Sequence, residues 1–278
     1  MSTVTITAQD INKLRQATGA GMMDCRKALT ETNGDFEAAI DWLRKQGQKV
    51  AAKRSDREAK EGVVIAKTTP DNKTGFIITI SCETDFVSKN ADFVAFAQSI
   101  ADAAVANNVK SVEELNEVTV NGAKVSDMIN DKLASIGEKI GIARFERVEA
   151  PYVASYIHGA YRMGVLVGFN KEAGEAGKDV AMQIAAMNPV AVDAASVPAE
   201  TVERERAIVV EQMKADPKMS GKPDDMIAKI AEGKLNAFFK ENTLTAQAFV
   251  KDSSKSVGDY LKSSGDLQVT EFKRVALG

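Results

Sequence analysis

One stretch near the middle of the chain brings together a thiol, two carboxylates, a hydroxyl and an aromatic ring: Cys82-Glu83-Thr84-Asp85-Phe86-Val87. It stands where a β-rich run gives way to a helical pattern. At an exposed strand-to-helix junction, a Phe beside an Asp can act as a wedge on another protein, since the ring inserts and the carboxylate repels or coordinates. The alternative is ordinary structure, in which Phe86 packs into the core and Thr84 or Asp85 caps the helix.

Covalent catalysis has few candidates in this sequence. Cys82 could serve as a nucleophile, but no activating base lies near it, and both Cys25 and Cys82 sit in apolar patterns typical of buried thiols. His158 is the only histidine, so a Ser-His-Asp arrangement would have to use it, and a His-rich metal site is excluded. The sequence contains neither G-x-x-x-x-G-K-S/T nor G-x-G-x-x-G, the familiar phosphate-binding loops. We therefore expect no metal and no cofactor in this chain.

Two adjacent methionines, Met22 and Met23, follow Gly19-Ala20-Gly21 at the expected start of a helix. Both cannot face a small core, so we expect one of them to point outward, where a flexible thioether suits contact with another protein. The alternative is one buried methionine and one that is exposed without a role.

The composition is that of an ordinary globular protein. The 278 residues suggest two or three domains, and 44% hydrophobic with 27% charged residues allow a core to form. A net charge of −3 gives no electrostatic push toward nucleic acid or an anionic membrane. No apolar run approaches the roughly 20 residues of a membrane-spanning helix, and residues 1–10 lack the features of a secretory signal. The two cysteines have no CxxC spacing, so we expect a reducing, cytoplasmic location.

Residues 1–47 are predicted to form a module of three short helices. Thr7 is an N-cap candidate for the first helix, with Asp10 three residues on, and Gly19 ends that helix. The third helix follows the i, i+3, i+4, i+7 rule with Phe36, Ala39, Ile40 and Leu43. A module of this size is marginal alone, so it must pack tightly or gain stability from a partner.

A basic stretch comes next, and we interpret residues 48–61 as a solvated linker helix. Its cations, together with one just before it, are Lys45, Lys49, Lys53, Arg54, Arg57 and Lys60. RNA binding by this stretch is disfavoured, because no aromatic residues interleave with the cations.

In the rest of the chain the period of the hydrophobic pattern changes, and strand-like runs appear between helical ones. Residues 63–65 and 76–82 predict a β-hairpin, and an amphipathic helix with Phe93 and Phe96 follows. The order strand, strand, helix recurs about 90 residues later. We therefore predict an α+β fold with two related α/β subdomains that contain antiparallel sheets, at residues 62–150 and 151–278. An insertion at about 198–240 is predicted to form a projecting antiparallel helical hairpin around a Pro/Gly turn.

Several segments resemble the elongation factor Ts family. TGAGMMDCRKAL (18–29) and NGDFEAAIDWLR (33–44) look like its N-terminal module, and CETDFVSKNADF (82–93) resembles its most diagnostic central motif. Similar to later family segments, in the same order, are YIHGAYRMGVLV (156–167), DVAMQIAAMNP (179–189) and LTAQAFVKD (244–252). The resemblance covers nearly the whole chain.

This resemblance implies a fold and a partner. The N-terminal module would be a ubiquitin-associated-type bundle, and the hairpin would be the family's coiled-coil insertion. The partner would be elongation factor Tu, the GTPase that carries aminoacyl-tRNA to the ribosome, and the chain would accelerate release of its GDP. The partner, not this chain, would hold the nucleotide and Mg²⁺. The chain would then be no enzyme and would need no direct contact with nucleic acid or a membrane.

The resemblance also assigns residues. Thr84-Asp85-Phe86-Val87 would disturb the Mg²⁺ and phosphate site of the partner. Arg15, Met22 and Met23 match N-terminal residues that touch the partner's nucleotide-binding domain. His158 matches a residue that the family places at the partner surface.

Two departures from the family pattern limit what can be carried over. Gln183 stands where many members have a His, and the chain ends soon after Phe272-Lys273-Arg274, whereas some members continue into a further helical module. Contacts made by that His or that module are not implied here. Two other functions stay open: a ubiquitin-associated-type or RNA-adaptor binding protein without exchange activity, and an enzyme with Cys82 as nucleophile.

Overall fold

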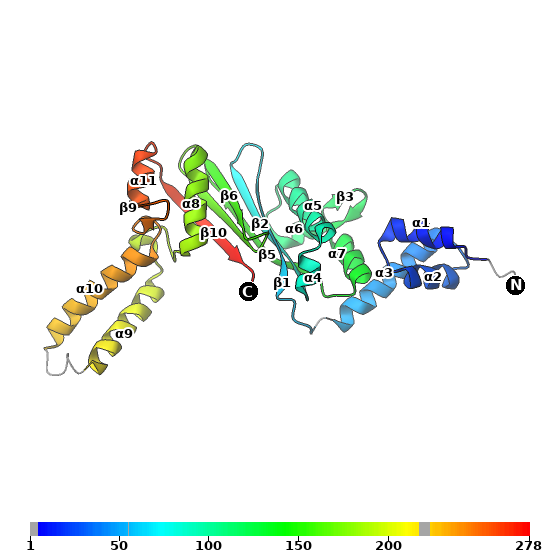
Figure 1. Ribbon diagram of the computed structural model, residues 1–278, viewed down its shortest axis with the longest axis horizontal. Helices are drawn as coiled ribbons and strands as arrows, with labels where there is room; N and C mark the ends of the chain where they lie inside the picture. The colour runs from blue at the N-terminus through cyan, green and yellow to red at the C-terminus, as the bar shows by residue number, and fades with distance from the viewer. Residues whose placement is uncertain (1–4, 55, 217–222) are drawn as a thin grey trace.

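The computed structural model describes residues 5–54, 56–216 and 223–278. Figure 1 shows an elongated molecule with three N-terminal helices at one end and two long helices projecting at the other. Between them lie two three-stranded antiparallel sheets, each with helices packed against it. Helices and antiparallel strands are thus mixed along the chain, which is the predicted α+β class.

The first three helices are α1 (Ala8–Thr18), α2 (Met22–Glu31) and α3 (Phe36–Lys53). Thr7 caps α1 as predicted: its hydroxyl accepts a hydrogen bond from the Asp10 amide, and the Asp10 carboxylate accepts one from the Thr7 amide. Gly19 ends α1 in the left-handed conformation, with φ at 68°. The small core between these helices consists of Leu14, Ala20, Cys25, Ala28, Leu29, Ala39 and Leu43.

Helix α3 differs from the prediction, because it continues through residue 48 to Lys53 and the expected linker helix is in part its last turns. Gly47 does not end α3. It lies where α3 crosses another helix so closely that a Cβ on Gly47 would stand 2.7 Å from the Cβ of Ala134. Residue 55 and the side chain of Lys53, both within the predicted basic stretch, lie outside the described residues.

The first sheet contains β1 (Glu61–Thr68), β2 (Thr74–Cys82) and β5 (Gly141–Glu149), with β2 in the middle. One face of this sheet packs against helix α5 (Ala91–Asn107). Phe93 and Ala97 of α5 are buried there against Ile65 and Ile78 of the sheet. The predicted hairpin and amphipathic helix are therefore present.

The segment between α5 and β5 contains two helices and two short strands. It contains α6 (Val112–Glu117), β3 (Thr119–Val120), β4 (Ala123–Lys124) and α7 (Val125–Ile136). Helix α7 buries Val125, Ile129 and Leu133 on the core side, and its other side meets α3.

The second sheet contains β6 (Tyr152–His158), β7 (Met163–Phe169) and β10 (Val269–Ala276), with β7 in the middle. Helix α8 (Gly174–Met187) covers its outer face. In both sheets a hairpin is followed by a helix, and a later strand then pairs with the second strand of the hairpin.

The two sheets face each other through the side chains that point away from their helices. The buried residues in this layer are Val64, Ala66, Ile77, Val148, Val153 and Leu166. Glycines allow the sheets to approach: a Cβ on Gly164 would lie 2.9 Å from Val64, and one on Gly75 would lie 2.7 Å from Val153. Strand β2 is consequently buried along its whole length.

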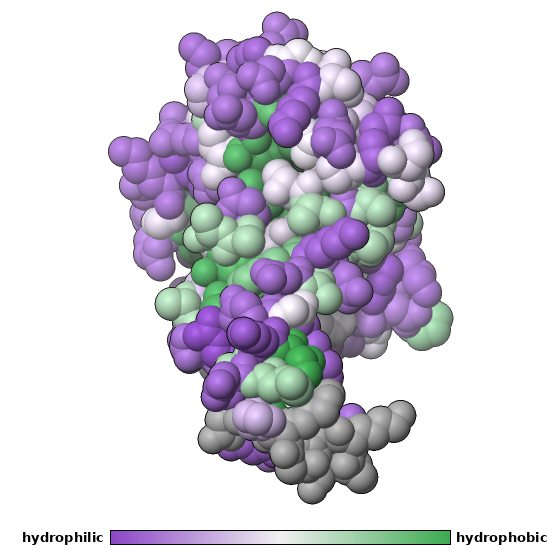
Figure 2. All heavy atoms as spheres, turned by 90° about the vertical axis from the view of Figure 1, so that its left-hand side faces the viewer, coloured by the Kyte–Doolittle hydropathy of each residue, from purple (hydrophilic) through white to green (hydrophobic). Residues whose placement is uncertain are grey.

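The helical hairpin consists of α9 (Ala199–Ala215) and α10 (Asp224–Asn242), which lie side by side and project from the second sheet (Figure 1). The predicted Pro/Gly turn at 217–222 lies outside the described residues. Figure 2 views this end of the molecule and shows apolar patches among hydrophilic residues, both over the hairpin and above it. None of the helices in the described part of the chain is long and apolar enough to cross a membrane.

Short elements complete the second half: η1 (Ala194–Ser196), β8 (Ala248–Phe249), β9 (Asp252–Ser256) and α11 (Val257–Ser263). Gln183 of α8 is fully buried against them. Its Nε2 donates to Gln247 Oε1 at 3.2 Å, and its Oε1 accepts the Val250 amide at 2.8 Å. Gln183 therefore holds α8 to the segment after the hairpin.

Gly47→Ala is expected to destabilise the protein by about 1–3 kcal/mol, because the added methyl group collides with Ala134 where α3 crosses α7. Gly233→Ala is the matched control: Gly233 also lies inside a helix but has open space around it, so Ala there is expected to be neutral or to stabilise by up to about 1 kcal/mol. Thermal unfolding followed by circular dichroism measures both variants. Equal midpoints would contradict the close approach of α3 and α7.

Candidate functional site

The predicted wedge, Thr84-Asp85-Phe86-Val87, follows the end of β2 and forms most of a single helical turn, α4 (Asp85–Ser88). The Phe86 side chain is 84% exposed, more than any other large apolar side chain in the described part of the chain. The next residue, Val87, packs against the core of the first sheet. The alternative in which Phe86 belongs to the core is therefore wrong, and its ring faces solvent, where another protein can meet it.

Neither predicted cap behaves as expected. Thr84 occupies the N-cap position of α4 but makes no side-chain capping bond. Its hydroxyl donates instead to Glu138 Oε1 at 2.6 Å. Asp85 lies inside the first turn, where a negative charge suits the helix dipole. Its carboxylate accepts a hydrogen bond from Lys89 Nζ at 2.7 Å, and this bond lowers the pKa of Asp85.

Glu138 holds the start of the wedge turn from a distant part of the chain. Its Oε2 accepts hydrogen bonds from the amides of Glu83 and Thr84, both at 3.0 Å, and its Oε1 accepts the Thr84 hydroxyl. Gly137, left-handed with φ at 78°, ends α7 and redirects the chain so that Glu138 reaches the end of β2. One carboxylate thus binds three donors at the point where β2 leaves the sheet.

Glu83 makes the reciprocal contact. Its Oε1 accepts hydrogen bonds from the Lys139 amide at 2.6 Å and from Arg54 Nη1 at 2.8 Å, and its Oε2 accepts one from Arg57 Nη1 at 3.2 Å. The Lys139 amide, followed by the two guanidinium groups, lowers the pKa of Glu83 to about 2. Glu83 therefore binds the main-chain amide next to Glu138, and Glu138 binds the main-chain amides of Glu83 and Thr84. We call Glu83 and Glu138 the carboxylate pair.

Cys82 is not placed to act as a nucleophile. Its side chain is fully buried, and its Sγ donates to the Thr84 carbonyl at 3.2 Å. Burial, and then the nearby carboxylates of Glu138 and Glu61, raise the pKa of the thiol to about 12. The reactive thiolate is thus almost absent near neutral pH, which removes the basis for an enzyme that uses this residue.

His158 ends β6 with its side chain exposed, and its Nδ1 lies 3.0 Å from the Tyr156 hydroxyl. The turn that follows, residues 159–162, docks on the first sheet. There the Val64 amide donates to the Tyr161 carbonyl at 2.8 Å. His158 is thereby held at the junction of the two sheets.

The same turn connects His158 to the wedge. Arg162 Nη1 binds Glu61 Oε2 at 3.0 Å, and Glu61 is the residue of β1 that pairs with Cys82 of β2. His158 and the turn that carries Phe86 therefore both lie beside the first residues of β1.

Arg15, Met22 and Met23 are exposed on the N-terminal module, which Figure 1 places at the far end of the molecule from the hairpin. Met22 is 54% exposed and Met23 is 72% exposed, so the expected outward methionine is present and the alternative with one buried methionine is wrong. The next turn of α2 fills the core instead, with Cys25, Ala28 and Leu29. The structure does not bring these three residues next to Phe86.

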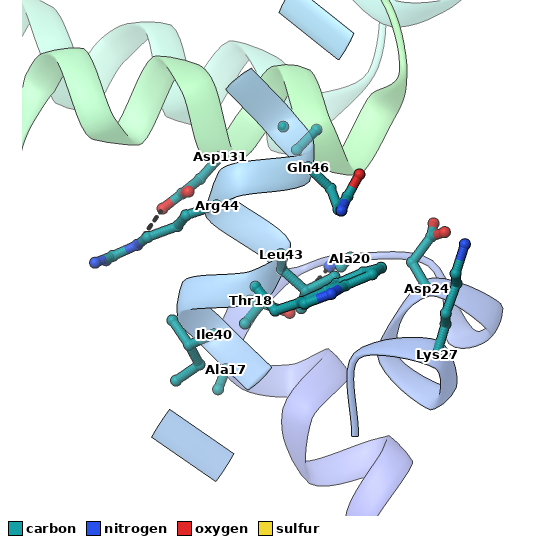
Figure 3. Close-up of a pocket in the computed structure, with 13 residues that line it drawn as sticks. Ala17, Thr18, Ala20, Asp24, Lys27, Ile40, Leu43, Arg44, Gln46 and Asp131 are labelled. Atoms are coloured by element: carbon teal, nitrogen blue, oxygen red, sulfur yellow. Dashed lines mark hydrogen bonds and ion pairs between the residues drawn. The ribbon is translucent and has the colours of Figure 1, made fainter. Parts of the chain in front are cut away.

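A cavity of about 360 Å³ lies between α1, α2, α3 and α7. Figure 3 shows α3 crossing it, with Arg44 directed at Asp131 of α7. Arg44 Nε and Asp131 Oδ2 are 3.8 Å apart and both side chains are partly exposed, so this ion pair contributes little. The N-terminal module is therefore joined to the rest of the molecule chiefly by the direct packing of α3 on α7.

The chain matches the family model described as Elongation factor TS over residues 83–278. It is 50% identical over 277 residues to the protein named Elongation factor Ts from Christiangramia forsetii, with 98% of this chain and 99% of the relative covered. The chain belongs to the elongation factor Ts family. Its identity to the protein of the same name is 49% in Flavobacterium psychrophilum, with 99% of both chains covered, and 44% in Methylococcus capsulatus, with 99% and 93% covered.

Membership of the elongation factor Ts family makes this chain an elongation factor of protein biosynthesis. The family model spans the wedge turn, the carboxylate pair and His158, and the full-length relatives also cover the N-terminal module. Within the described residues, no group of three or more His, Cys, Asp or Glu side chains is arranged to hold a metal ion.

Sequence reasoning missed α7 and the role of Glu138 in this elongation factor Ts chain. For α7 a signal exists, because Val125, Ile129 and Leu133 recur every fourth residue and Gly137 follows as a stop. For Glu138 there is none, because the residues that it binds lie 54 and 55 positions away in the chain.

Glu83→Gln is expected to destabilise the protein at neutral pH by about 1–3 kcal/mol, because charge-assisted hydrogen bonds are lost. The pKa of Glu83 is lowered on folding from 4.5 to about 2, so its contribution is complete above pH 4.5 and disappears as the pH falls toward 2. Thermal unfolding of both proteins between pH 7 and pH 2 measures the difference. Glu58→Gln, which removes an exposed carboxylate nearby, is the control and is expected to change little. If Glu83→Gln is still less stable than the wild type by the same amount at pH 2, the ion pairs of Glu83 are excluded as the cause of the difference.

The two thiols are expected to resist alkylation in the native protein. A pKa of about 12 for Cys82, against 9.0 for an ordinary thiol, lowers the thiolate population about a thousandfold, and burial raises the pKa of Cys25 as well. Mass spectrometry after iodoacetamide treatment at about pH 8 should show slow labelling of the folded chain and fast labelling of the denatured chain. Rapid native labelling of Cys82 would restore it as a candidate nucleophile.

Proposed function

We propose that this chain is a guanine-nucleotide exchange factor that binds elongation factor Tu with GDP and promotes release of the GDP. The observation that carries the proposal is the exposed Phe86 ring on a turn anchored to the body by Glu138. A large aromatic side chain that is exposed in the free protein and carried on a fixed backbone suits insertion into another protein. Thr84, Asp85 and Val87 belong to the same inserting element.

The mechanism needs no covalent step. A GTPase holds GDP through Mg²⁺ and through groups around the β-phosphate. Insertion of Phe86 displaces the partner's elements that position the metal, while Asp85 adds negative charge beside the phosphate site. The phosphate charge is then poorly compensated, and GDP leaves faster. The chain therefore acts without being an enzyme, and the nucleotide and Mg²⁺ remain ligands of the partner.

The energy comes from the protein–protein interface, and the coupling is reciprocal. If the chain weakens nucleotide binding, nucleotide weakens binding of the chain by the same factor. A coupling free energy of about 3 kcal/mol changes the affinity roughly 150-fold. The chain lowers the barrier to exchange for GDP and GTP alike, so cellular nucleotide concentrations decide which one rebinds.

Other surfaces supply the rest of the interface. Arg15, Met22 and Met23 are proposed to contact the nucleotide-binding domain of elongation factor Tu, and His158 to contact the partner beside Phe86; all four side chains are exposed. In this proposal the N-terminal helices are a ubiquitin-associated-type bundle, the two sheets mark related subdomains, and the hairpin is the coiled-coil insertion. The chain acts in the cytoplasm, and no direct contact with nucleic acid or a membrane is required.

Phe86→Ala is expected to slow the maximal rate of GDP release from elongation factor Tu by about tenfold or more. The concentration that gives half-maximal stimulation is expected to change less than about threefold, because the ring acts in the release step more than in docking. Stopped-flow release of a fluorescent GDP measures both quantities.

Met226→Ala is the matched control for that experiment. Met226 is also a large exposed apolar residue, but it lies on α10 in the projecting hairpin, so its loss is expected to leave the maximal rate unchanged. An unchanged stimulated rate in Phe86→Ala would remove Phe86 from the mechanism.

A further inference from the structure

We propose that Glu138 is a positioning residue for nucleotide exchange: its hydrogen bonds to the start of the wedge turn hold Phe86 in the direction that insertion requires. The inference rests on the proposed exchange function and adds to it a residue that does not itself reach the partner's nucleotide.

Helix α4 cannot set the direction of Phe86 alone. It has four residues, and a helix of one turn is unstable in isolation. Its own main-chain bonds are few: the Ser88 amide donates to the Thr84 carbonyl at 3.3 Å and the Lys89 amide to the Asp85 carbonyl at 3.0 Å. Because Thr84 does not cap the turn, contacts from outside it must fix its orientation.

Two outside contacts bracket Phe86. On one side, Val87 packs into the core of the first sheet. On the other side, Glu138 binds the amides of Glu83 and Thr84 and the hydroxyl of Thr84. The ring between these anchors is exposed and has little packing of its own, so the path of the backbone decides where it points.

Glu138 is itself attached to the body of the protein. Leu133 before it and Ile140 after it are buried in the core of the first sheet. The adjacent Lys139 amide donates to Glu83 Oε1 at 2.6 Å, so the carboxylate pair binds in both directions. Loss of the Glu138 carboxylate therefore releases the amides of Glu83 and Thr84 and the Thr84 hydroxyl, while the Glu83 carboxylate, Val87 and the strand stay in place.

Two substitutions separate the hydrogen bonds from the charge. Glu138→Ala removes all three acceptor contacts. Glu138→Gln can keep the pattern, because the amide oxygen can accept both N–H groups and the amide nitrogen can donate to the Thr84 hydroxyl oxygen. A positioning role predicts that Ala is harmful and that Gln restores most of the activity.

The experiment is stopped-flow release of fluorescent GDP from elongation factor Tu by the full chain. Glu138→Ala is expected to lower the maximal stimulated rate about tenfold, with less than about threefold change in the half-maximal concentration, and Glu138→Gln to stay within about threefold of the wild type. The same substitution in a Phe86→Ala background is expected to cause no further loss, because a residue that acts only by placing the ring has nothing left to place.

Hydrogen exchange measured by mass spectrometry supplies a readout that is independent of activity. Glu138→Ala is expected to lose protection at residues 83–88 and to keep it in β7. Glu114→Ala is the control for the loss of a glutamate that binds a main-chain amide. Glu114 lies away from the wedge, and its Oε2 accepts a hydrogen bond from the Lys110 amide at 2.7 Å. It is expected to leave the release rate unchanged.

Each outcome decides between the proposals. A wild-type chain that does not accelerate release would refute the exchange function, and this inference with it. Acceleration by the wild type with an unchanged rate in Glu138→Ala would overturn the positioning role alone. So would a further tenfold loss on top of Phe86→Ala, or unchanged protection at residues 83–88.

Discussion

Burial of strand β2 on both faces is the constraint on which the rest of the molecule depends. Phe76, Ile78 and Ile80 point toward α5, while Ile77 points into the layer between the two sheets. The strand cannot shift without disturbing both cores, because close-packed protein interiors are sensitive to a volume change of even one methylene group. Whatever follows Cys82 therefore starts from a fixed point. A wedge needs such a support, since a ring on a yielding base would itself be displaced by the partner.

The wedge turn and the N-terminal module share their supports. Helix α3 packs on α7 at Gly47, and the chain just beyond α3 carries Arg54 to Glu83. Glu83 in turn binds the Lys139 amide, and Glu138 beside it follows Gly137, the residue that ends α7. These contacts link α3 to the end of β2 and the end of β2 to the segment after α7, and α7 itself packs on α3. The surface that carries Met22 and Met23 is thus connected mechanically to the surface that carries Phe86, although the two lie apart. A partner that engages both surfaces meets one framework with two separate contact sites.

Sequence patterns predict the parts of this framework that rest on local periodicity. The capped first helix, the hairpin of the first sheet and the projecting helices all have a repeat of two or 3.6 residues that side-chain burial imposes. Contacts between distant segments have no such signature. Gly47 has the sequence character of a helix end, yet it marks a helix crossing, because a sequence does not reveal that Ala134 lies opposite. The same limit applies to Thr84, whose residue type suits a cap but whose hydroxyl has a better acceptor in Glu138. The sequence likewise does not decide whether Phe86 is exposed, since a Phe beside a helix start is compatible with the core as well as with the surface.

The energetics explain why a wedge of this kind needs anchors. Full burial of one aromatic ring stabilises a complex by about 1.5–3 kcal/mol. Fixing the backbone of one residue costs about 1–2 kcal/mol, so ordering an unanchored turn of four residues on binding would cost about 4–8 kcal/mol. That cost exceeds what the ring can return, and a loose turn would therefore add nothing to the coupling between the two proteins. The hydrogen bonds to Glu138 and the packing of Val87 already order the turn when the free chain folds, so binding does not carry this entropy cost. The free energy of inserting Phe86 then remains available to displace the partner's nucleotide-binding elements.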